Sequence, residues 1–321
     1  MSKIIISGAS GHLGRELTRE LLRKVSPVDI RLVTRTPEKL RPVVPAEVEI
    51  VVGDFNKPEL LDEAYKGGDV LMLISGTAIT KRVQEHRNAI EAAKKAGIKH
   101  VVYTSYVGIH PQNPNLAARD HIRTEADLIR CGLEYTILRD ATYANWVYEL
   151  SILPALRTGR WVSIKGDGRL APVAKEDVVA SIVEILASPE FHANATYEIS
   201  GPDLFSFREI AELSRDVFNS SFVIDEVTPD ERLAIWDSIG IPRTREEGIA
   251  AHAEAEWLAS DELISGEMAI AQTGYQGILS DHVRMITGRA PRSFRSVLEE
   301  IAASGEQRSI IEEVQQAGAA S

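Results

Sequence analysis

The sequence predicts an α/β protein with a doubly wound parallel sheet, followed by a smaller, mainly helical C-terminal lobe. Three observations lead to this fold class. Short runs rich in β-branched residues alternate with helical patterns up to about residue 140, a glycine-rich turn connects the first run to the first helix, and the alternation stops near residue 150. Regular alternation of strands and helices gives right-handed crossovers and a parallel sheet that is covered on both faces.

The first half of the chain supplies the predicted sheet. Lys3–Ser7 contains three consecutive isoleucines and ends at Gly8, which is typical of a buried strand. Leu13–Lys24 follows at once and has leucines at helical spacing. Further strands are predicted at Ile30–Thr34, Val48–Val52, Val70–Ser75, His100–Ser105 and Tyr135–Arg139, and further helices at Leu60–Tyr65, His86–Ala96 and Asp120–Arg130.

The second half of the chain has a less regular pattern. Ser206 stands at the start of a helical pattern, and Glu209 follows Ser206 by three residues, which is the capping-box spacing. Residues 229–264 look helical and acidic, and residues 304–321 are polar enough to fray. Strands are predicted at Trp161–Ile164 and Thr196–Ser200, and helices at Lys175–Leu186 and Ser206–Val217.

These patterns suggest a division into two parts. We expect a first domain over residues 1–155 and a mainly helical lobe over residues 156–321, placed over the carboxyl edge of the sheet. Residues 175–200, which include a predicted helix, are expected to pack back on the first domain, so the boundary is not a clean one.

Composition and charge argue against several classes of function. The 321 residues include 36 basic and 47 acidic ones, and a net charge of −11 does not suit a broad nucleic-acid surface. The single cysteine, Cys131, leaves no internal disulfide and no cysteine-cluster metal site. The histidines lack the paired spacing of metal ligands, and no apolar run suits a signal peptide or membrane helix. We therefore expect a cytoplasmic protein without a metal, nucleic-acid or membrane partner.

The first strand–helix junction carries the sequence Gly8-Ala9-Ser10-Gly11-His12-Leu13-Gly14, with the spacing GxxGxxG. Gly8 permits a tight turn, Gly11 lets the backbone approach a pyrophosphate, and Gly14 lets the helix pack closely on the sheet. The free amides at the start of the helix bind phosphate oxygens. A chance glycine turn is the alternative, but the position at the first strand–helix junction favours a dinucleotide-binding Rossmann domain.

The end of the second predicted strand indicates which dinucleotide binds. An NAD-binding domain usually has a carboxylate here, about 20 residues after the glycines, that accepts from the ribose 2′-hydroxyl. This chain has Thr34-Arg35 instead, and Arg35 can form charge-assisted hydrogen bonds with a 2′-phosphate. We therefore expect NADP(H) to be preferred over NAD(H), although a solvated loop arginine is the alternative.

Several further motifs resemble one family. With Glu85-His86-Arg87-Asn88 and Tyr103-Thr104-Ser105, the chain resembles the NmrA-like branch of the atypical short-chain dehydrogenases. Within it, the chain is most similar to the type 2 NAD(P)H:quinone oxidoreductases, which are akin to triphenylmethane dye reductases. The most specific stretches are His121-Ile122-Arg123-Thr124-Glu125, Tyr135-Thr136-Ile137-Leu138-Arg139 and Gly166-Asp167-Gly168-Arg169.

The resemblance implies roles for matching residues, all placed after strands. Gly8 to Leu13 would hold the pyrophosphate, with Gly14 behind them, and Arg35 would bind the 2′-phosphate. Asp54 and Phe55 would flank the adenine. Ser75, Gly76 and Thr77 would line the cofactor together with Ser105, and Arg139, Asp140, Ala141, Thr142, Tyr143 and Ala144 would approach the nicotinamide end. Ligands of such sheets do bind at the carboxyl ends of strands.

The chain departs from the standard family at the catalytic dyad. Standard short-chain reductases use Tyr-x-x-x-Lys, in which the tyrosine gives a proton to the carbonyl oxygen. When Glu125 is aligned with the glutamate that often follows the lysine, His121 takes the lysine position and Ala117 the tyrosine position. The missing acid favours hydride delivery to a quinone or dye over ketone reduction. The absence of this acid is equally compatible with a protein that binds the dinucleotide and catalyses no reaction.

Three side chains remain as catalytic candidates. The imidazole of His121 could bond a quinone oxygen or the ribose, and Tyr106 and Tyr143 could offer hydroxyls, while packing is the alternative for each. We expect an NADPH-dependent reductase that acts on a small planar substrate, aromatic or quinoid, with homodimer formation left open. The alternatives are a non-catalytic regulatory protein that senses NADP(H), and a pathway-specific reductase or isomerase of the same family.

Overall fold

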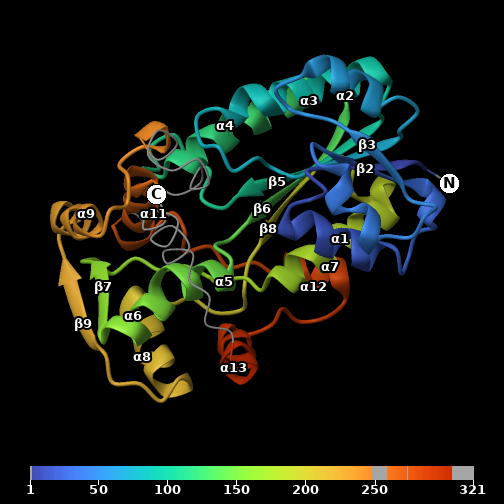
Figure 1. The fold of residues 1–321 in the computed structure, drawn as a ribbon. Coiled ribbons are helices and arrows are strands. Elements are labelled where there is room, and N and C mark those ends of the chain that lie inside the picture. The colour runs from blue at the N-terminus through green and yellow to red at the C-terminus, as the bar shows by residue number, and fades with distance from the viewer. Residues whose placement is uncertain (1, 248–258, 273, 306–321) are drawn as a thin grey trace.

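Seven strands form one parallel sheet at the centre of the molecule (Figure 1). The structure, a computed structural model, describes residues 2–247, 259–272 and 274–305. The predicted doubly wound α/β fold is confirmed. In spatial order the strands are β3 (Glu49–Val52), β2 (Ile30–Thr34), β1 (Ile4–Ser7), β4 (Val70–Leu73), β5 (His100–Tyr106), β6 (Glu134–Asp140) and β8 (Ala195–Ile199).

The order of the strands reverses direction at β1. The chain moves outward from β1 to β3, returns to β4 on the other side of β1, and then moves outward again to β8. Ile4 of β1 is in register with Ile30 of β2 and with Val70 of β4. Because all these strands are parallel, their carboxyl ends meet at one edge, and ligands of this fold bind where the order reverses.

Helices cover both faces of the sheet (Figure 1). One face carries α1 (His12–Leu21), α7 (Lys175–Ala187) and α12 (His282–Thr287), and the other carries α2 (Pro58–Ala64), α3 (Arg82–Ala96) and α4 (Leu116–Arg130). Successive residues of a strand point to opposite faces. Leu138 of β6 accordingly packs in the cluster under α1 and α7, while Ile137 packs in the cluster under α3 and α4.

Two helices begin four residues earlier than the sequence predicts. Helix α3 begins at Arg82 rather than His86, and α4 begins at Leu116 rather than Asp120. The Asn115 side chain caps α4 by accepting a hydrogen bond from the amide of Ala117. The predicted starts were wrong because α3 has no side-chain cap, its N-cap residue being Lys81, and because the asparagine cap of α4 was not recognised in the sequence.

The second half of the chain forms a separate apolar cluster beside the sheet. Two parallel strands, β7 (Arg160–Ile164) and β9 (Val223–Val227), pair with each other. The predicted capping box of Ser206 and Glu209 is confirmed at the start of α8. The other helices of this half are α5 (Ala144–Val147), α6 (Leu153–Thr158), α8 (Phe207–Val217), α9 (Pro229–Ser238), α11 (Ser260–Ala271) and α13 (Phe294–Ser304).

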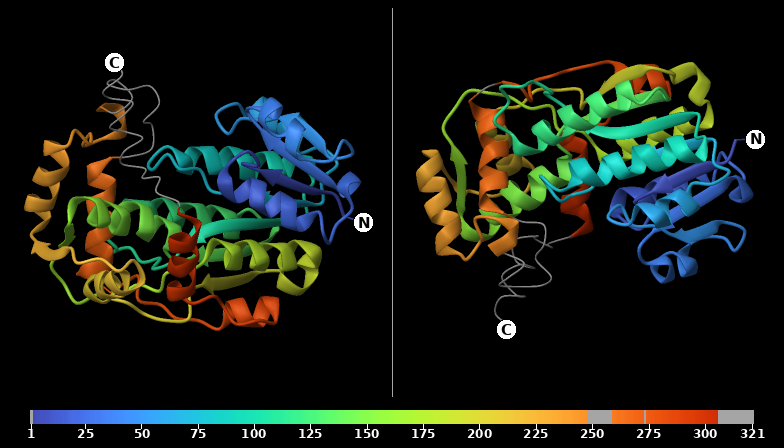
Figure 2. Two further views of the ribbon diagram at one scale, coloured as in Figure 1. Left: turned by 60° about the horizontal axis from the view of Figure 1, so that its bottom comes forward. Right: turned by 90° about the horizontal axis from the view of Figure 1, so that it is seen from above.

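This half is not continuous in sequence. Figure 2 shows α9 and β9 at the end of the molecule opposite the N-terminal strand. In contrast, α7 packs against α1, and β8 pairs with β6 as the last strand of the sheet. Residues between the two strands of the small sheet therefore return to the large one.

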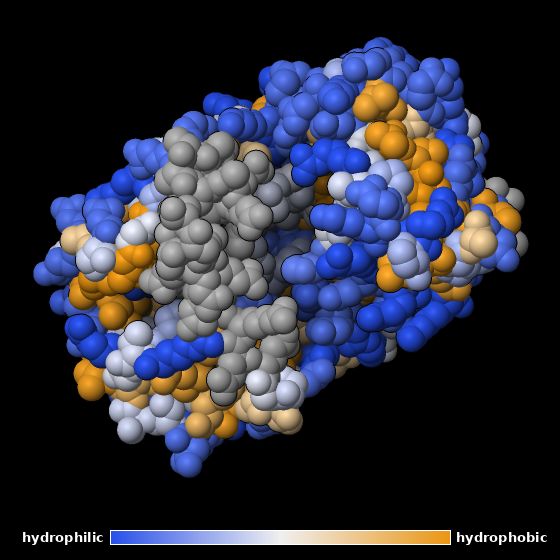
Figure 3. Space-filling model, viewed as in Figure 1, coloured by the Kyte–Doolittle hydropathy of each residue, from blue (hydrophilic) through white to orange (hydrophobic). Residues whose placement is uncertain are grey.

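One face of the surface is largely polar where its residues are described. Hydrophilic residues cover most of the face shown in Figure 3, with smaller hydrophobic patches between them. Within the described part of the chain, none of the helices combines the length and the apolar character needed to cross a membrane. Parts of two predicted segments, residues 248–258 and 306–321, lie outside the described residues.

Candidate active site

The glycine-rich turn lies between β1 and α1, as the sequence predicts. Gly8 has a φ of +87°, a left-handed conformation that glycine adopts without steric cost. A Cβ at Gly14 would lie 2.6 Å from the carbonyl oxygen of Gly8 and 2.7 Å from Cα of Ala9. A Cβ at Gly11 would meet only the Gly8 carbonyl oxygen, at 3.4 Å. The turn is therefore packed tightly against the helix at Gly14 and open at Gly11.

Helix α1 begins in a way that suits an anion. Gly11 is its N-cap residue, and no side chain caps the helix. Its first turn contains no acidic residue, whereas the first turns of α2, α3, α7, α8, α9 and α11 each contain one or two. Unpaired amides and the positive end of the helix dipole stabilise a phosphate. The residues present therefore fit the pyrophosphate of a dinucleotide.

The other predicted cofactor residues follow neighbouring strands. The Ser10 hydroxyl accepts a hydrogen bond of 2.8 Å from Thr34 at the end of β2, so the turn is tied to that strand. The structure brings the predicted residues to one edge, with Arg35 exposed after β2, Asp54 and Phe55 after β3, and Ser75, Gly76 and Thr77 after β4. Their contacts with a cofactor remain a prediction.

Ser105 and Arg139 are bonded within the protein. Arg139 donates to both carboxylate oxygens of Glu125, at 3.0 and 2.7 Å, and to Glu198 at 3.0 Å. The Ser105 hydroxyl donates to Glu125 at 2.6 Å. The hydrogen bond and charge of Glu125 raise the pKa of Arg139. These bonds fix the ends of β5 and β6, and a direct cofactor contact by either side chain stays a prediction.

Asp140 and Tyr143 form a buried pair at the end of β6. Tyr143 donates to Oδ2 of Asp140 at 2.8 Å, and Oδ1 of Asp140 is buried without a partner among the described residues. Burial raises the pKa of Asp140 to about 8. Burial, followed by the charge of Asp140, raises the pKa of Tyr143 well above its usual range. Asp140 is therefore largely protonated at neutral pH.

We expect Asp140→Asn to stabilise the protein more at pH 8 than at pH 5. The folded pKa lies above the unfolded value near 4, so wild-type stability falls as pH rises between them, by about 1.4 kcal/mol per pH unit at most. Asparagine cannot ionise, so the variant lacks this pH dependence of the free energy of unfolding. Urea unfolding at both pH values measures it, with the exposed Asp203→Asn as control. Parallel pH curves for wild type and Asp140→Asn would contradict the assignment.

Two of the three catalytic candidates lie together. His121 of α4 is buried, and its ring stacks on that of Tyr106 at the end of β5, with centroids 6.1 Å apart. Tyr106 accepts a hydrogen bond of 3.2 Å from Asn115. Burial, aided by the nearby charge of Arg82, lowers the pKa of His121 well below its usual range. His121 is therefore a neutral imidazole at physiological pH.

Tyr143 is not brought together with this pair. It packs in the apolar cluster under α1 and α7, whereas His121 belongs to α4 on the opposite face of the sheet. Its hydroxyl is already bonded to Asp140. Tyr143 therefore suits a role at the cofactor side better than one beside His121, and both roles remain predictions.

Sequence reasoning missed a buried ion pair next to His121. Arg82 donates to Oδ2 of Asp120 at 3.3 Å, and both side chains are less than a tenth exposed. Arg82 also donates to the carbonyl oxygen of Gly76 at 3.1 Å, and the amide of Thr80 donates to Asp120 at 2.7 Å. The pair therefore holds the loop after β4, which is predicted to line the cofactor, against α4.

His86 and Tyr103 were also missed as site residues. His86 is fully buried on α3, and Tyr103 is fully buried on β5. The signal in the sequence was the position of His86, and of Arg82 one turn before it, on the same helical stripe as Val83 and Ile90. Polar residues on an otherwise apolar stripe are expected to be hydrogen-bonded inside the protein.

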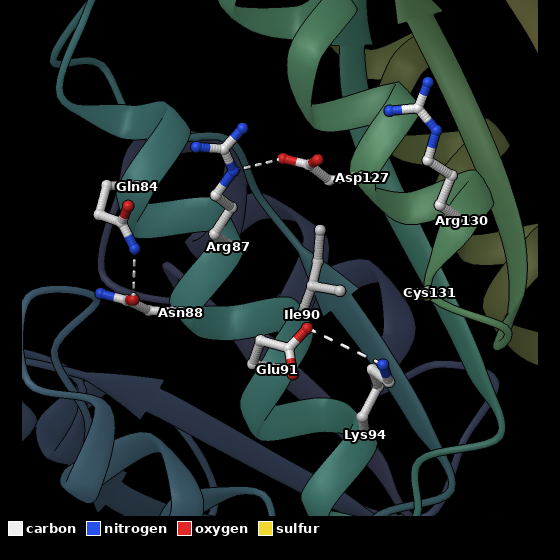
Figure 4. A pocket seen from close by; sticks show the side chains of 9 residues that line it. All are labelled: Gln84, Arg87, Asn88, Ile90, Glu91, Lys94, Asp127, Arg130 and Cys131. Atoms are coloured by element: carbon white, nitrogen blue, oxygen red, sulfur yellow. Dashed lines mark hydrogen bonds and ion pairs between the residues drawn. The ribbon is translucent and has the colours of Figure 1, made fainter.

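A furrow of about 390 Å³ lies elsewhere, between the outer faces of α3 and α4 (Figure 4). Its polar residues bond with one another, as Arg87 does with Asp127 at 2.6 Å. It extends to Arg130 and Cys131 at the C-terminal end of α4, a few residues before β6 begins, and so lies toward the amino-terminal edge of the sheet. The lining residues are Gln84, Arg87, Asn88, Ile90, Glu91, Lys94, Asp127, Arg130 and Cys131, none of them a predicted site residue.

The described residues offer no metal centre. Among them, no group of three or more His, Cys, Asp or Glu side chains is arranged to hold a metal ion.

The strand order and the glycine turn at the first junction define a Rossmann-type dinucleotide-binding protein. A family model described as NAD(P)H-binding matches residues 8–189. The chain belongs to this NAD(P)H-binding family, and it is an NAD(P)H-dependent oxidoreductase.

Individual relatives confirm the predicted resemblance. Quinone oxidoreductase 2 of Escherichia coli K12 is 29% identical over 240 residues, which cover 74% of this chain and 82% of that protein. The crystal structure of the Escherichia coli enzyme with NADPH has a TM-score of 0.82 at 26% identity, covering 93% and 99% of the two chains. Triphenylmethane reductase of Citrobacter sp. with NADP(H) has a TM-score of 0.79 at 26% identity, covering 94% and 99%.

Proposed function

We propose that this protein transfers a hydride from NADPH to a small planar acceptor of the quinone or dye class. The observation that carries the proposal is the dyad position, where Ala117 offers no hydroxyl and His121 is a buried neutral imidazole. A site without a strong acid suits an acceptor whose reduced form is stable before protonation. The named substrates of the relatives, quinones and triphenylmethane dyes, support the same class.

Residues at the carboxyl edge of the sheet would bind the cofactor at one place and the acceptor at another. The amides at the start of α1 hold the pyrophosphate, which directs the other end of the cofactor towards β5 and β6. When bound, NADPH supplies the hydride from its nicotinamide ring. His121 on α4 and Tyr106 at the end of β5 can then donate hydrogen bonds to the oxygen atom of the acceptor, which gains negative charge.

Steady-state oxidation of NADPH with a panel of quinones and cationic dyes tests the proposal. We expect turnover with these acceptors and little with simple ketones. Calorimetric binding of NADPH without turnover of any acceptor would instead favour a protein that senses the cofactor. Turnover of ketones alone would reject the acceptor class and keep the reductase.

Cofactor preference gives a second measurement. We expect Arg35→Ala to raise the KM for NADPH about 10–100-fold and to leave the KM for NADH nearly unchanged, because charge-assisted hydrogen bonds contribute about 1.5–3 kcal/mol. Arg35 is exposed and makes no ion pair among the described residues. Arg130→Ala removes an exposed charge at the far end of α4 and serves as control. An equal effect on both cofactors would reject the 2′-phosphate assignment.

A further inference from the structure

We propose that His86 and Tyr103 are positioning residues that hold His121 with its proton on Nε2, as a hydrogen-bond donor to the acceptor. The acceptor rests on the proposed function, while the proton positions follow from the hydrogen bonds and from the burial of both imidazole rings. The chain of bonds begins at the backbone amide of Gly76, in the loop after β4, and ends at His121 on α4.

The first bond fixes the proton of His86. The backbone amide of Gly76 lies 3.0 Å from Nε2 of His86. An amide N–H can only donate, so Nε2 accepts and carries no proton. Burial, with the charge of Arg82 as the second cause, lowers the pKa of His86 to about 3. His86 is therefore neutral and carries its single proton on Nδ1.

Nδ1 of His86 donates its proton to a neighbouring hydroxyl group. It lies 3.0 Å from the hydroxyl oxygen of Thr124 and 3.4 Å from that of Tyr103. The Thr124 hydroxyl donates to the carbonyl oxygen of Asp120 at 3.1 Å, so it accepts from His86. Because Nδ1 is a donor, His86 cannot accept the hydroxyl proton of Tyr103.

The hydroxyl proton of Tyr103 therefore has to be donated elsewhere, and His121 lies within reach of it. The Tyr103 oxygen lies 2.6 Å from Nδ1 of His121, which is a short hydrogen bond. An imidazole nitrogen accepts more strongly than a phenol oxygen, so Tyr103 donates here. A neutral His121 must then carry its proton on Nε2, which makes no hydrogen bond to any described residue.

The consequence concerns the charge that develops during reduction. Hydride arrival at a quinone places negative charge on its oxygen, and a fixed N–H donor stabilises that charge. Loss of one such preorganised donor typically lowers kcat about 10²–10³-fold. A freely rotating imidazole, or one with its proton on Nδ1, would not present the donor. His86 and Tyr103 therefore act on the reaction through His121.

Nuclear magnetic resonance on the full chain labelled with ¹⁵N-histidine tests the chain of bonds. Two-bond ¹H–¹⁵N correlations distinguish a proton on Nδ1 from one on Nε2, and His121→Ala identifies the signals of His121 among those of the eight histidines. We expect the Nε2–H form in the wild type. In Tyr103→Phe we expect signals of exchanging tautomers, with kcat about tenfold lower and the KM for NADPH within about twofold.

Tyr197→Phe is the matched control, because it removes another tyrosine–histidine bond, of 2.9 Å to His192, outside this chain of bonds. Its His121 signals and kcat should equal those of the wild type. His86→Gln is the second variant, and it too should release the tautomer. An Nδ1–H form in the wild type overturns the assignment, as do unchanged signals in both variants. An unchanged kcat in His121→Ala overturns its role as donor, while absence of all turnover in the wild type overturns only the proposed function.

Discussion

The Gly14→Ala variant is expected to bind NADPH at least about a hundredfold more weakly than the wild type and to lose about 1–3 kcal/mol of stability. The added methyl group would lie 2.6 to 2.7 Å from backbone atoms of Gly8 and Ala9, which cannot move aside as a side chain can. The turn must shift away from α1, and its amides lose their alignment on the pyrophosphate. Elsewhere in a helix the same change usually stabilises by about 1 kcal/mol.

Gly11→Ala is the control for this variant. Its methyl group would be 3.4 Å from the Gly8 carbonyl oxygen, an ordinary contact, so stability should change by less than about 1 kcal/mol. Binding should weaken nevertheless, because the methyl group occupies the path of the pyrophosphate. Urea unfolding and calorimetric titration with NADPH separate the two effects. Wild-type affinity in Gly14→Ala would place the pyrophosphate elsewhere.

Asp120→Ala is expected to lower the free energy of unfolding by about 3–5 kcal/mol, because it leaves Arg82 buried without its counter-ion. The amide of Thr80, which has the unusual φ of +72°, also loses its acceptor. The loop after β4 should loosen as well, so NADPH affinity should fall together with stability. Chemical unfolding, with and without NADPH, measures both.

Asp127→Ala gives a matched control on the same two helices. Asp127 of α4 pairs with Arg87 of α3, but these side chains are 26% and 48% exposed (Figure 4). Exposed ion pairs contribute little, so we expect a change of less than about 1 kcal/mol. Similar losses in Asp120→Ala and Asp127→Ala would show that burial does not decide the strength of this interaction.

The parallel sheet could be predicted because its strands are buried on both faces. Ile4, Ile5 and Ile6 of β1 are all less than 5% exposed, and such continuous apolar runs are the clearest strand signal in a sequence. The glycine turn could also be predicted, because each glycine has a steric reason that depends on local sequence alone. These features predict the place of the cofactor before any coordinates are known.

Strand β9 shows what local sequence does not reveal. Asp225 and Glu226 lie in its middle, and acidic residues disfavour strands. Its partner β7 lies about sixty residues earlier, where Arg160 forms an ion pair of 2.7 Å with Asp225. The strand therefore depends on a pairing between distant segments, which periodicity cannot detect.

The hydrogen bonds that connect Gly76 with His121 could not be predicted from the sequence either. His121 could be selected because an alignment placed it at the dyad, and Tyr106 because it directly follows the predicted strand that ends at Ser105. Tyr103 and His86 instead come from β5 and α3, and their roles depend on which hydroxyl faces which ring nitrogen. Only the packed arrangement of both elements with α4 defines those contacts.

The late position of β8 in the chain has a consequence for protein engineering. Residues 195–199 complete the large sheet and α7 packs against α1, yet both follow β7, the first strand of the small sheet. A fragment that stops at residue 155 would present β6 as a bare edge, which invites aggregation. Chimeras that exchange the part around the small sheet between homologues must therefore join the polypeptide at several points, so that α7 and β8 stay with the large sheet.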